Sequence, residues 1–492
     1  MVYLILIFAG LFVFLSYRRL DWALMLILVC LPVYQLRFSA FGLPMTLLEV
    51  MILSSFAVWF LRETKFLSFL KRQYGWRDYL VARKERAPYP FRHEIALVLV
   101  VSFVAVGISH FSNSSLGIWK AYFFEPILFY VLVLNVFQEK DETGKAKFNF
   151  EKIILPILFS GFLVSLFAIF QKATGILTMS NFWPRVTGVF TYPNALGLYL
   201  APMVLLATGM IKNYELRITN FKFLGFLGLI LVYLLAIVFA SSEGALVGIL
   251  AAWFIFALLW VGEKFKFNFL NYLAKIFIII FLGFSIIAPW FFLKVIPEYK
   301  YFNFSSHSLN YLTDKLMLKD FSGEVRKQQW RETWAMMTVS PATFIFGTGL
   351  DNYRASVAPY HQPGIFFNFD RDMDFRRKIV WAGSEYKTKH WQPVEIYMYP
   401  HNIFLNFWTE LGLAGMVLFI WIIGRFIYIG LKLLKQESEY KGIILGLIGA
   451  MIVIFVHGLV DVPYFKNDLA VVFWVLLALM GALEVGLKKK VR

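Results

Sequence analysis

Charge and cysteine are what this sequence has least of. Only 16% of its 492 residues are charged, whereas soluble globular domains have about 25%, and 59% are hydrophobic. This composition excludes an ordinary soluble protein and indicates a polytopic membrane protein. The only cysteine is Cys30, so no intrachain disulfide can form. Residues 1–15 lack a basic start and a small-residue cleavage site, so we expect a retained membrane segment rather than a signal peptide.

Long hydrophobic runs recur along the chain. A helix needs about 20 apolar residues to cross a bilayer, or somewhat fewer where aromatic residues anchor its ends. The runs predict an all-α polytopic membrane protein with about 12–13 transmembrane helices and one long, partly helical external loop. The expected crossings are 2–16, 22–36, 44–61, 94–111, 116–137, 152–171, 187–211, 222–240, 243–262, 272–293, 402–430, 441–459 and 467–487.

Basic residues are distributed unequally between the two sets of connections. If the crossings alternate, one set of connections carries 29 Lys and Arg residues and the other carries 5 in its short loops. The positive-inside rule then predicts an external N-terminus, an external loop at 294–399 and a cytoplasmic C-terminus. The chain accordingly divides into 1–293, 294–399 and 400–492. The basic run 62–92 lies at membrane ends, which indicates contact with anionic lipids rather than with nucleic acid.

Two external connections in the first half contain notable residues. Arg185 stands in a loop rich in Gly and Pro before the crossing at 187–211, where it is a fixed cation at the outer interface. Contact with lipid headgroups is the alternative interpretation. The turn 240–245 (Ala-Ser-Ser-Glu-Gly-Ala) contains small residues that allow two helices to approach closely.

The long loop contains a predicted helix that begins at Ser322 and ends at Ser340. Arg326, Trp330 and Trp334 share one face of it because they are four residues apart. An arginine stacked on tryptophan is held rigidly and can bind a phosphate, although a purely structural cation–π pair is the alternative. The later Gly347-Thr348-Gly349 predicts a tight turn and not a nucleotide-binding loop.

His401 is the strongest candidate for chemistry. It follows Pro400, which predicts that it lies on the first turn of the next membrane helix. The positive helix end disfavours imidazolium and attracts phosphate, so the pattern favours a general base beside an anion site. A histidine bonded to a backbone carbonyl is the alternative. His457 and Asp461 are four residues apart, which predicts a structural hydrogen-bonded pair.

The remaining acidic residues give no metal site. Asp370, Asp372 and Asp374 alternate along the chain, but Phe375 stands where a calcium-binding loop needs glycine, and arginines interleave with the acids. We therefore expect a self-neutralised surface, with no metal and no cofactor. Glu49 and Glu125 lie in expected crossings; either could be functional or could be a partner for an interfacial lysine.

Taken in order, these motifs resemble those of the O-antigen ligase and polymerase family of bacterial envelope glycosyltransferases. The resemblance covers about 183–425, and its matching residues are Arg185, Gly188, Pro193, Asn194, Arg326, Trp330, Pro341, Gly347, Gly349, Pro400, His401, Asn402, Leu405, Glu410, Gly412 and Gly415. One position departs from the family pattern, since Glu243 stands where the family often has arginine.

The resemblance implies an enzyme of the bacterial inner membrane that moves a glycan from an undecaprenyl-diphosphate carrier to an acceptor hydroxyl, with inversion and without metal. It implies that Arg326 and His401 are catalytic. Its implied diphosphate-binding residues are Arg185, Asn194 and Asn402, and its supporting residues are Trp330, Asp351, Glu410, His457 and Asp461. The acceptor could be a glycolipid, a glycan or a protein, so ligase, polymerase and protein O-glycosyltransferase all remain open. A lipid-linked sugar transporter or flippase is the alternative of another class, but it predicts internal repeats and a midplane site.

Overall fold

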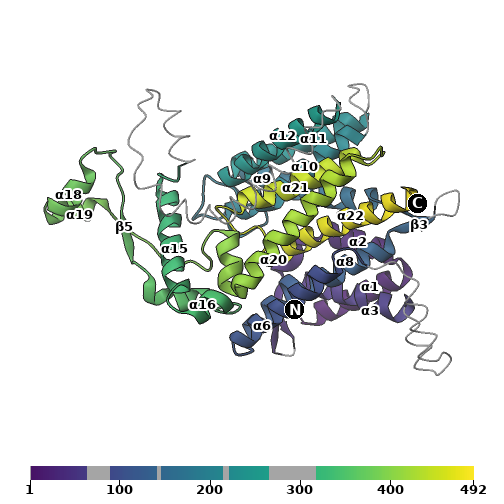
Figure 1. Cartoon of the computed structure of the whole chain (residues 1–492), viewed down its shortest axis with the longest axis horizontal. Coiled ribbons are helices and arrows are strands. Elements are labelled where there is room, and N and C mark those ends of the chain that lie inside the picture. Colours follow the sequence, from purple (N-terminus) through teal and green to yellow (C-terminus); the bar gives the residue numbers. More distant parts are fainter. Residues whose placement is uncertain are drawn as a thin grey trace.

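The computed structural model describes residues 2–40, 42–63, 89–140, 146–213, 221–264 and 317–491. Within these ranges the chain is a bundle of apolar helices with a polar unit at one end (Figure 1). We call residues 317–399 the cap unit. The C-terminus and the ribbon strand β3 lie at the opposite end of the bundle.

The elements of the bundle are mainly long helices. Its helices are α1 (Val2–Arg18), α2 (Leu20–Val29), α3 (Leu47–Glu63), α6 (Arg92–Ile108), α7 (Asn113–Trp119), α8 (Glu125–Val136), α9 (Glu151–Thr174), α10 (Pro193–Asn213), α11 (Phe221–Phe239), α12 (Glu243–Lys264), α20 (Ile403–Leu434), α21 (Lys441–His457) and α22 (Asn467–Val491). Shorter pieces are the 3-10 helix η1 (Leu31–Gln35), the π-helix η2 (Lys120–Phe124) and the paired strands β1 (Arg37–Ala40) with β2 (Leu43–Thr46) and β3 (Gln138–Lys140) with β4 (Ala146–Phe148).

The cap unit is also largely helical. It contains α15 (Phe321–Met337), α16 (Pro341–Phe346), α17 (Tyr353–Val357), the 3-10 helix η3 (Ala358–Tyr360), α18 (Phe375–Trp381) and α19 (Ser384–His390), with the antiparallel strands β5 (Gly364–Phe366) and β6 (Trp391–Pro393). A small apolar cluster joins it to the bundle: Trp330 and Tyr353 of the cap unit pack with Leu405 and Trp408 of α20.

Seven helices in the described part are long and apolar enough to cross a membrane, and α1, α2 and α21 are shorter apolar helices. The all-α polytopic membrane fold predicted from the sequence is therefore confirmed. Each expected crossing within the described ranges overlaps a helix, whereas 272–293 lies outside them.

Two predicted boundaries are wrong by several residues, and the crossing expected at 187–211 begins as a helix only at Pro193. The crossing expected at 22–36 ends as an α-helix at Val29, and η1 follows it. Pro32 lies within η1, and proline has no N–H with which to continue an α-helix.

Small residues set the closest helix contacts. A side chain at Gly209 of α10 would lie 2.5 Å from the carbonyl oxygen of Gly442 in α21, so these two backbones touch. A Cβ at Gly197 would lie 2.0 Å from Ser242 Oγ, and one at Gly244 would lie 2.6 Å from the ring of His457. The close approach predicted at the turn 240–245 is thus confirmed, because only small residues allow such spacing.

A glycine turn fixes the cap unit to the helix bundle. We call residues 347–352 the latch turn. Gly347 and Gly349 have φ of +75° and +84°, a region that favours glycine. The Thr348 N–H donates to the carbonyl of Thr409 in α20 (2.7 Å), where α20 is itself interrupted at Gly412 with φ of +74°. The tight turn predicted from the two glycines is present, and it docks in this break of α20.

Candidate active site

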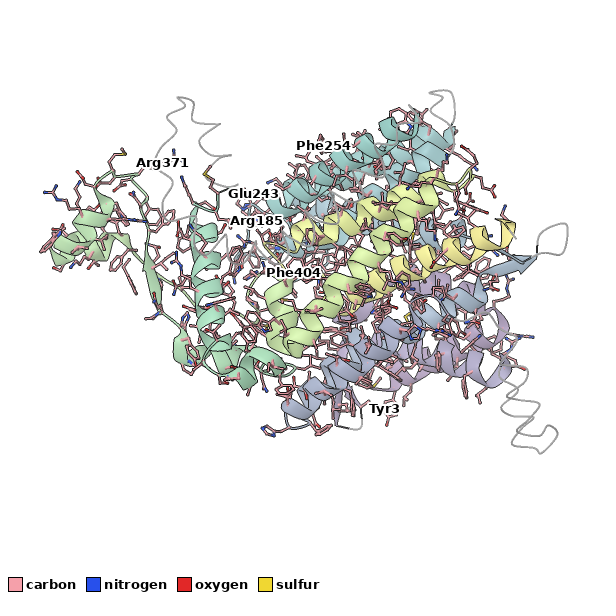
Figure 2. All side chains as sticks on the ribbon, viewed as in Figure 1. Tyr3, Arg185, Glu243, Phe254, Arg371 and Phe404 are labelled. Carbon is pink, nitrogen blue, oxygen red and sulfur yellow. The ribbon has the colours of Figure 1, made fainter. Side chains whose placement is uncertain are left out.

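Arg185 is held by protein groups at the end of the bundle nearest the cap unit. Its Nη2 donates to Asn194 Oδ1 (2.8 Å), and its Nε donates to the carbonyl of Ala240 (2.9 Å). Burial lowers the pKa of Arg185, and the nearby charge of Glu243 opposes that shift. Figure 2 shows Arg185 and Glu243 beside each other. The guanidinium is therefore a fixed cation with a defined orientation.

Asn194 links this cation to a buried carboxylate. Its Nδ2 donates to Asp461 Oδ2 (3.3 Å), while Asp461 Oδ1 accepts from the Val462 N–H (2.8 Å). Asp461 lies in the connection between α21 and α22 and is only 1% exposed. Burial alone would raise the pKa of Asp461, but His401, His457 and Arg326 hold that pKa well below its usual value.

His401 lies at the other side of Asp461, with 3.8 Å between His401 Nδ1 and Asp461 Oδ1. The prediction that His401 lies on the first helical turn is wrong, because α20 begins at Ile403 and Asn402 caps it. His401 instead has φ of +46°, a conformation uncommon for residues other than glycine. The rings of Tyr397 and Tyr399 pack edge-on against its imidazole, with ring centroids 5.1 and 5.0 Å apart.

Asn402 holds the start of α20. Its Oδ1 accepts from the N–H groups of Phe404 and Leu405, each at 3.0 Å, and its Nδ2 donates to the carbonyl of Leu459 (3.0 Å). This arrangement is a helix N-cap that also fixes the connection carrying Asp461. Diphosphate binding by Asn402 stays a prediction.

Helix α15 of the cap unit binds both backbone segments of this site. Arg326 Nε donates to the carbonyl of Val460 (2.9 Å), directly before Asp461, and its Nη1 reaches Ser322. Trp330 Nε1 donates to the carbonyl of Pro400 (2.9 Å), directly before His401. The four-residue spacing of Arg326 and Trp330 thus places each against one side of the site. The predicted stack between these two side chains stays a prediction.

His457 and Asp461 interact electrostatically, but among the described residues the hydrogen bond that the sequence predicted between them is absent. The ring of His457 packs against Gly244 of α12, and its Nδ1 has no hydrogen-bond partner among the described residues. Helix α21 ends at His457, and the connection after it carries Asp461 toward α10 and Asn194. The i, i+4 relation that supported the predicted pair therefore does not apply.

Asp351 and Glu410 lie at the latch turn rather than in this row. The Asp351 N–H donates to Glu410 Oε2 (2.7 Å), and the Ser114 hydroxyl contacts the Asp351 carboxylate. These contacts attach the latch turn to α20 and to α7. Their direct role is structural, and any further supporting role in catalysis stays a prediction.

Other acidic residues have basic partners. Lys120 Nζ contacts Glu49 and lies 3.8 Å from Glu125, which matches the interpretation of these acids as partners for a lysine. In the described ranges, no group of three or more His, Cys, Asp or Glu side chains is arranged to hold a metal. Asp370 forms an ion pair with Lys389 (2.9 Å), and Asp372 forms one with Lys378 (2.7 Å). The sequence predicted that arginines would neutralise these acids, whereas in the structure lysines do so.

Two tyrosines at the site were missed in the sequence. The Tyr399 hydroxyl donates to the Tyr192 hydroxyl (3.1 Å), which joins the segment before His401 to the segment before Asn194. The signal was available, since Tyr192-Pro193-Asn194 and Tyr399-Pro400-His401 are the same Tyr-Pro pair followed by a polar residue. The two segments that share this Tyr-Pro pair are the two that contact each other at the site.

The helices of membrane-spanning length, with a row of polar residues at one end of their bundle, define a multi-pass membrane protein with a candidate site at the ends of its helices. Residues 227–420 match the family model described as O-antigen ligase, and this match supports the O-antigen ligase family for the chain. The matched range includes Arg326 and His401, while Arg185 and Asp461 lie outside it. No curated protein matches the chain. The family supports glycosyl transfer of the ligase or polymerase type, with a lipid-linked glycan and an acceptor as partners in general.

Proposed function

We propose that this protein transfers a glycan from an undecaprenyl-diphosphate-linked donor to an acceptor hydroxyl at the outer face of the bacterial inner membrane. The observation that carries the proposal is the continuous row Arg185, Asn194, Asp461 and His401, with Arg326 bound beside it. A cation for a diphosphate and a base for a hydroxyl are the two groups that this reaction needs.

His401 is the proposed general base. The Asp461 carboxylate lies 3.8 Å from Nδ1 of the imidazole, beyond hydrogen-bond distance, and its negative charge favours the tautomer with the proton on Nδ1 and with Nε2 available to accept one. The acceptor oxygen attacks the anomeric carbon, its proton moves to Nε2, and the bond from that carbon to the phosphate oxygen breaks. One displacement from the opposite face inverts the anomeric configuration.

Arg185 and Arg326 are the proposed ligands of the diphosphate leaving group. Undecaprenyl diphosphate departs as a stabilised anion, so fixed positive charge contributes more than protonation of the leaving group. Arginine suits this role because its planar fork can bind two phosphate oxygens at once. The reaction as written requires neither a metal nor a nucleotide.

The site lies at the helix ends next to the cap unit, and this position favours an enzyme over a transporter. A transporter or flippase would use a site near the middle of its helices. The acceptor distinguishes the three possible activities: a glycolipid acceptor would make the protein a ligase, a glycan acceptor a polymerase, and a protein acceptor a protein O-glycosyltransferase.

The purified protein in proteoliposomes tests this proposal. With an undecaprenyl-diphosphate glycan and separate glycolipid, glycan and peptide acceptors, we expect one of them to gain glycan in proportion to released undecaprenyl diphosphate. A chelator should not change the rate. Release of the carrier without transfer to any acceptor, or movement of the intact donor between leaflets without bond breakage, would reject the proposal.

A further inference from the structure

A protruding arm of the cap unit has exposed aromatic and basic side chains. We call residues 364–393 the arm; it consists of the β5–β6 ribbon, α18 and α19. Figure 1 shows it extending away from the helix bundle, and Arg371, labelled in Figure 2, lies on it. Trp381 at the end of α18 is 82% exposed, and Met373 is 70% exposed. Phe369 and Val380 of the arm are also exposed, and this number of exposed large apolar side chains on one small unit indicates an interaction surface.

The arm has an excess of positive charge. Residues 367–390 contain six Lys and Arg against four Asp and Glu. The ion pairs of Asp370 with Lys389 and of Asp372 with Lys378 use two of the four acids, which lowers the pKa of both carboxyls. Arg376 and Arg377 form no ion pair within the described ranges, and both are exposed. The binding partner that matches this surface is anionic.

Aromatic residues lie beside this charge. Arg377 and Trp381 are four residues apart on α18, so they share a helix face. On the ribbon, the ring of Trp391 lies against Gly364 and meets Phe366 at a centroid distance of 4.9 Å. The exposed indole of Trp381 therefore lies on the same helix face as the Arg377 cation, and the ribbon adds the partly exposed rings of Trp391 and Phe366. That combination suits a chain of sugar rings with acidic substituents, because ring faces stack on aromatics and acidic groups bind arginine.

The base of the arm starts at the candidate active site. Phe367 contacts Phe321, the first residue of α15, with ring centroids 5.5 Å apart. The next residue, Ser322, binds the guanidinium of Arg326. His361 also joins Glu332 of α15 to Val394, where the ribbon returns to the cap unit. The base of the arm therefore contacts both ends of the same helix segment that carries Arg326.

We propose that the arm binds the glycan of the lipid-linked donor beyond the reacting sugar, and that this glycan is acidic. The inference rests on the proposed function, since it concerns the substrate of the same site. The direction of the arm distinguishes a glycan from a lipid surface, because it extends away from the bundle ends where lipid would lie.

Binding of defined oligosaccharides to the purified full chain tests the arm without any transfer reaction. The probes are oligogalacturonate and a neutral dextran oligosaccharide of equal length. We expect tighter binding of oligogalacturonate, about tenfold weaker binding in the double variant Arg376→Gln and Arg377→Gln, and a comparable loss in Trp381→Ala. Trp381→Tyr should retain binding, and so should the control Arg354→Gln on α17.

Transfer assays separate this inference from the proposed function. With a long acidic donor, the arm variants should raise KM, whereas turnover of a donor with a short glycan should stay unchanged. A wild-type chain that binds neither probe, binds both equally, or binds only anionic lipid vesicles overturns the inference. The same holds if the arm variants bind like wild type. Absence of transfer by the wild type would reject the proposed function, while the binding assay would still decide the role of the arm.

Discussion

At the scale of single residues, Asp461 connects the two halves of the site. It accepts a hydrogen bond from Asn194, which holds Arg185, and it faces Nδ1 of His401. A buried carboxylate is costly unless hydrogen bonds and positive charge surround it. The N–H groups of Asn194 and Val462 supply such hydrogen bonds, and the guanidinium of Arg326 supplies positive charge, so Asp461 can remain ionised although it is buried.

The low pKa of Asp461 leads us to expect that the stability of the fold depends on pH. Its folded pKa lies below the ordinary value of 3.8, so its ionised form stabilises the fold above that pH, and this contribution is lost as pH falls. We expect the wild type to lose about 1–3 kcal/mol of stability on acidification below pH 4 through this group. Asp461→Asn should show a smaller loss over the same range. Thermal unfolding in detergent at pH 7 and pH 3 measures both, and equal pH dependence would contradict the assignment.

We expect substitution by lysine to have different effects at the two arginines. Arg326→Lys keeps the charge but removes the Nε contact to Val460 and the planar fork, so donor affinity or turnover should fall strongly, by about tenfold or more. Arg185→Lys should also impair transfer, but less, because a point charge at that position partly suffices. Titration with lipid-linked donor and initial rates measure the two effects. Full activity in both variants would show that the arginines are structural.

The residue-scale predictions from sequence succeeded where spacing within one helix decided the geometry. Arg326 and Trp330 follow the α-helical repeat, and the structure places both against the site. The pairing of His457 with Asp461 failed because it assumed that α21 continues past His457. The Gly458 carbonyl instead accepts from the N–H of Ile403, a contact between distant segments that no local pattern reveals.

At the scale of elements, the latch turn couples the cap unit to the bundle. A side chain at Gly349 would lie 2.4 Å from Ser109 Oγ of the α6 end, and φ at this position is +84°. The latch turn docks at the break of α20, because a Cβ at Gly347 would lie 2.6 Å from the Thr409 carbonyl oxygen and 2.7 Å from the Gly412 nitrogen. The sequence indicated a turn from its glycines, but it could not indicate which helices the turn contacts.

Gly349→Ala tests this coupling. The substitution adds a Cβ in a strained conformation against α6, and we expect a loss of about 1–3 kcal/mol in stability. Gly383→Ala is a matched control, since a Cβ there meets nothing within 4 Å. Thermal unfolding of both variants in one detergent gives the comparison. Equal melting temperatures would show that the latch turn does not hold the cap unit.

At the scale of the whole molecule, the charge asymmetry gives the predicted orientation. The cap unit lies at one end of the bundle, and β3 and the C-terminus lie at the other, as the alternation of crossings requires. Hydrophobic runs could predict the helices because the bilayer imposes their length. They could not predict the break at Gly412 or the end of α2, which depend on single glycine and proline residues.

Cysteine labelling tests the orientation. In a Cys30→Ser background, Ser384→Cys on the arm should react with an impermeant maleimide in intact spheroplasts. Glu437→Cys, between α20 and α21, should react only after lysis. The opposite labelling pattern would place the candidate site on the cytoplasmic side, away from an external donor.

The most direct measurement is the transfer rate of His401→Gln in proteoliposomes with a saturating lipid-linked donor. Glutamine keeps hydrogen bonding but cannot accept a proton at neutral pH, so transfer should fall by about 10²–10⁴-fold while donor binding and membrane insertion persist. A chelator should leave the wild-type rate unchanged. Transfer by His401→Gln at the wild-type rate over a range of pH would contradict the assignment of His401 as the base and make His457 the next residue to substitute.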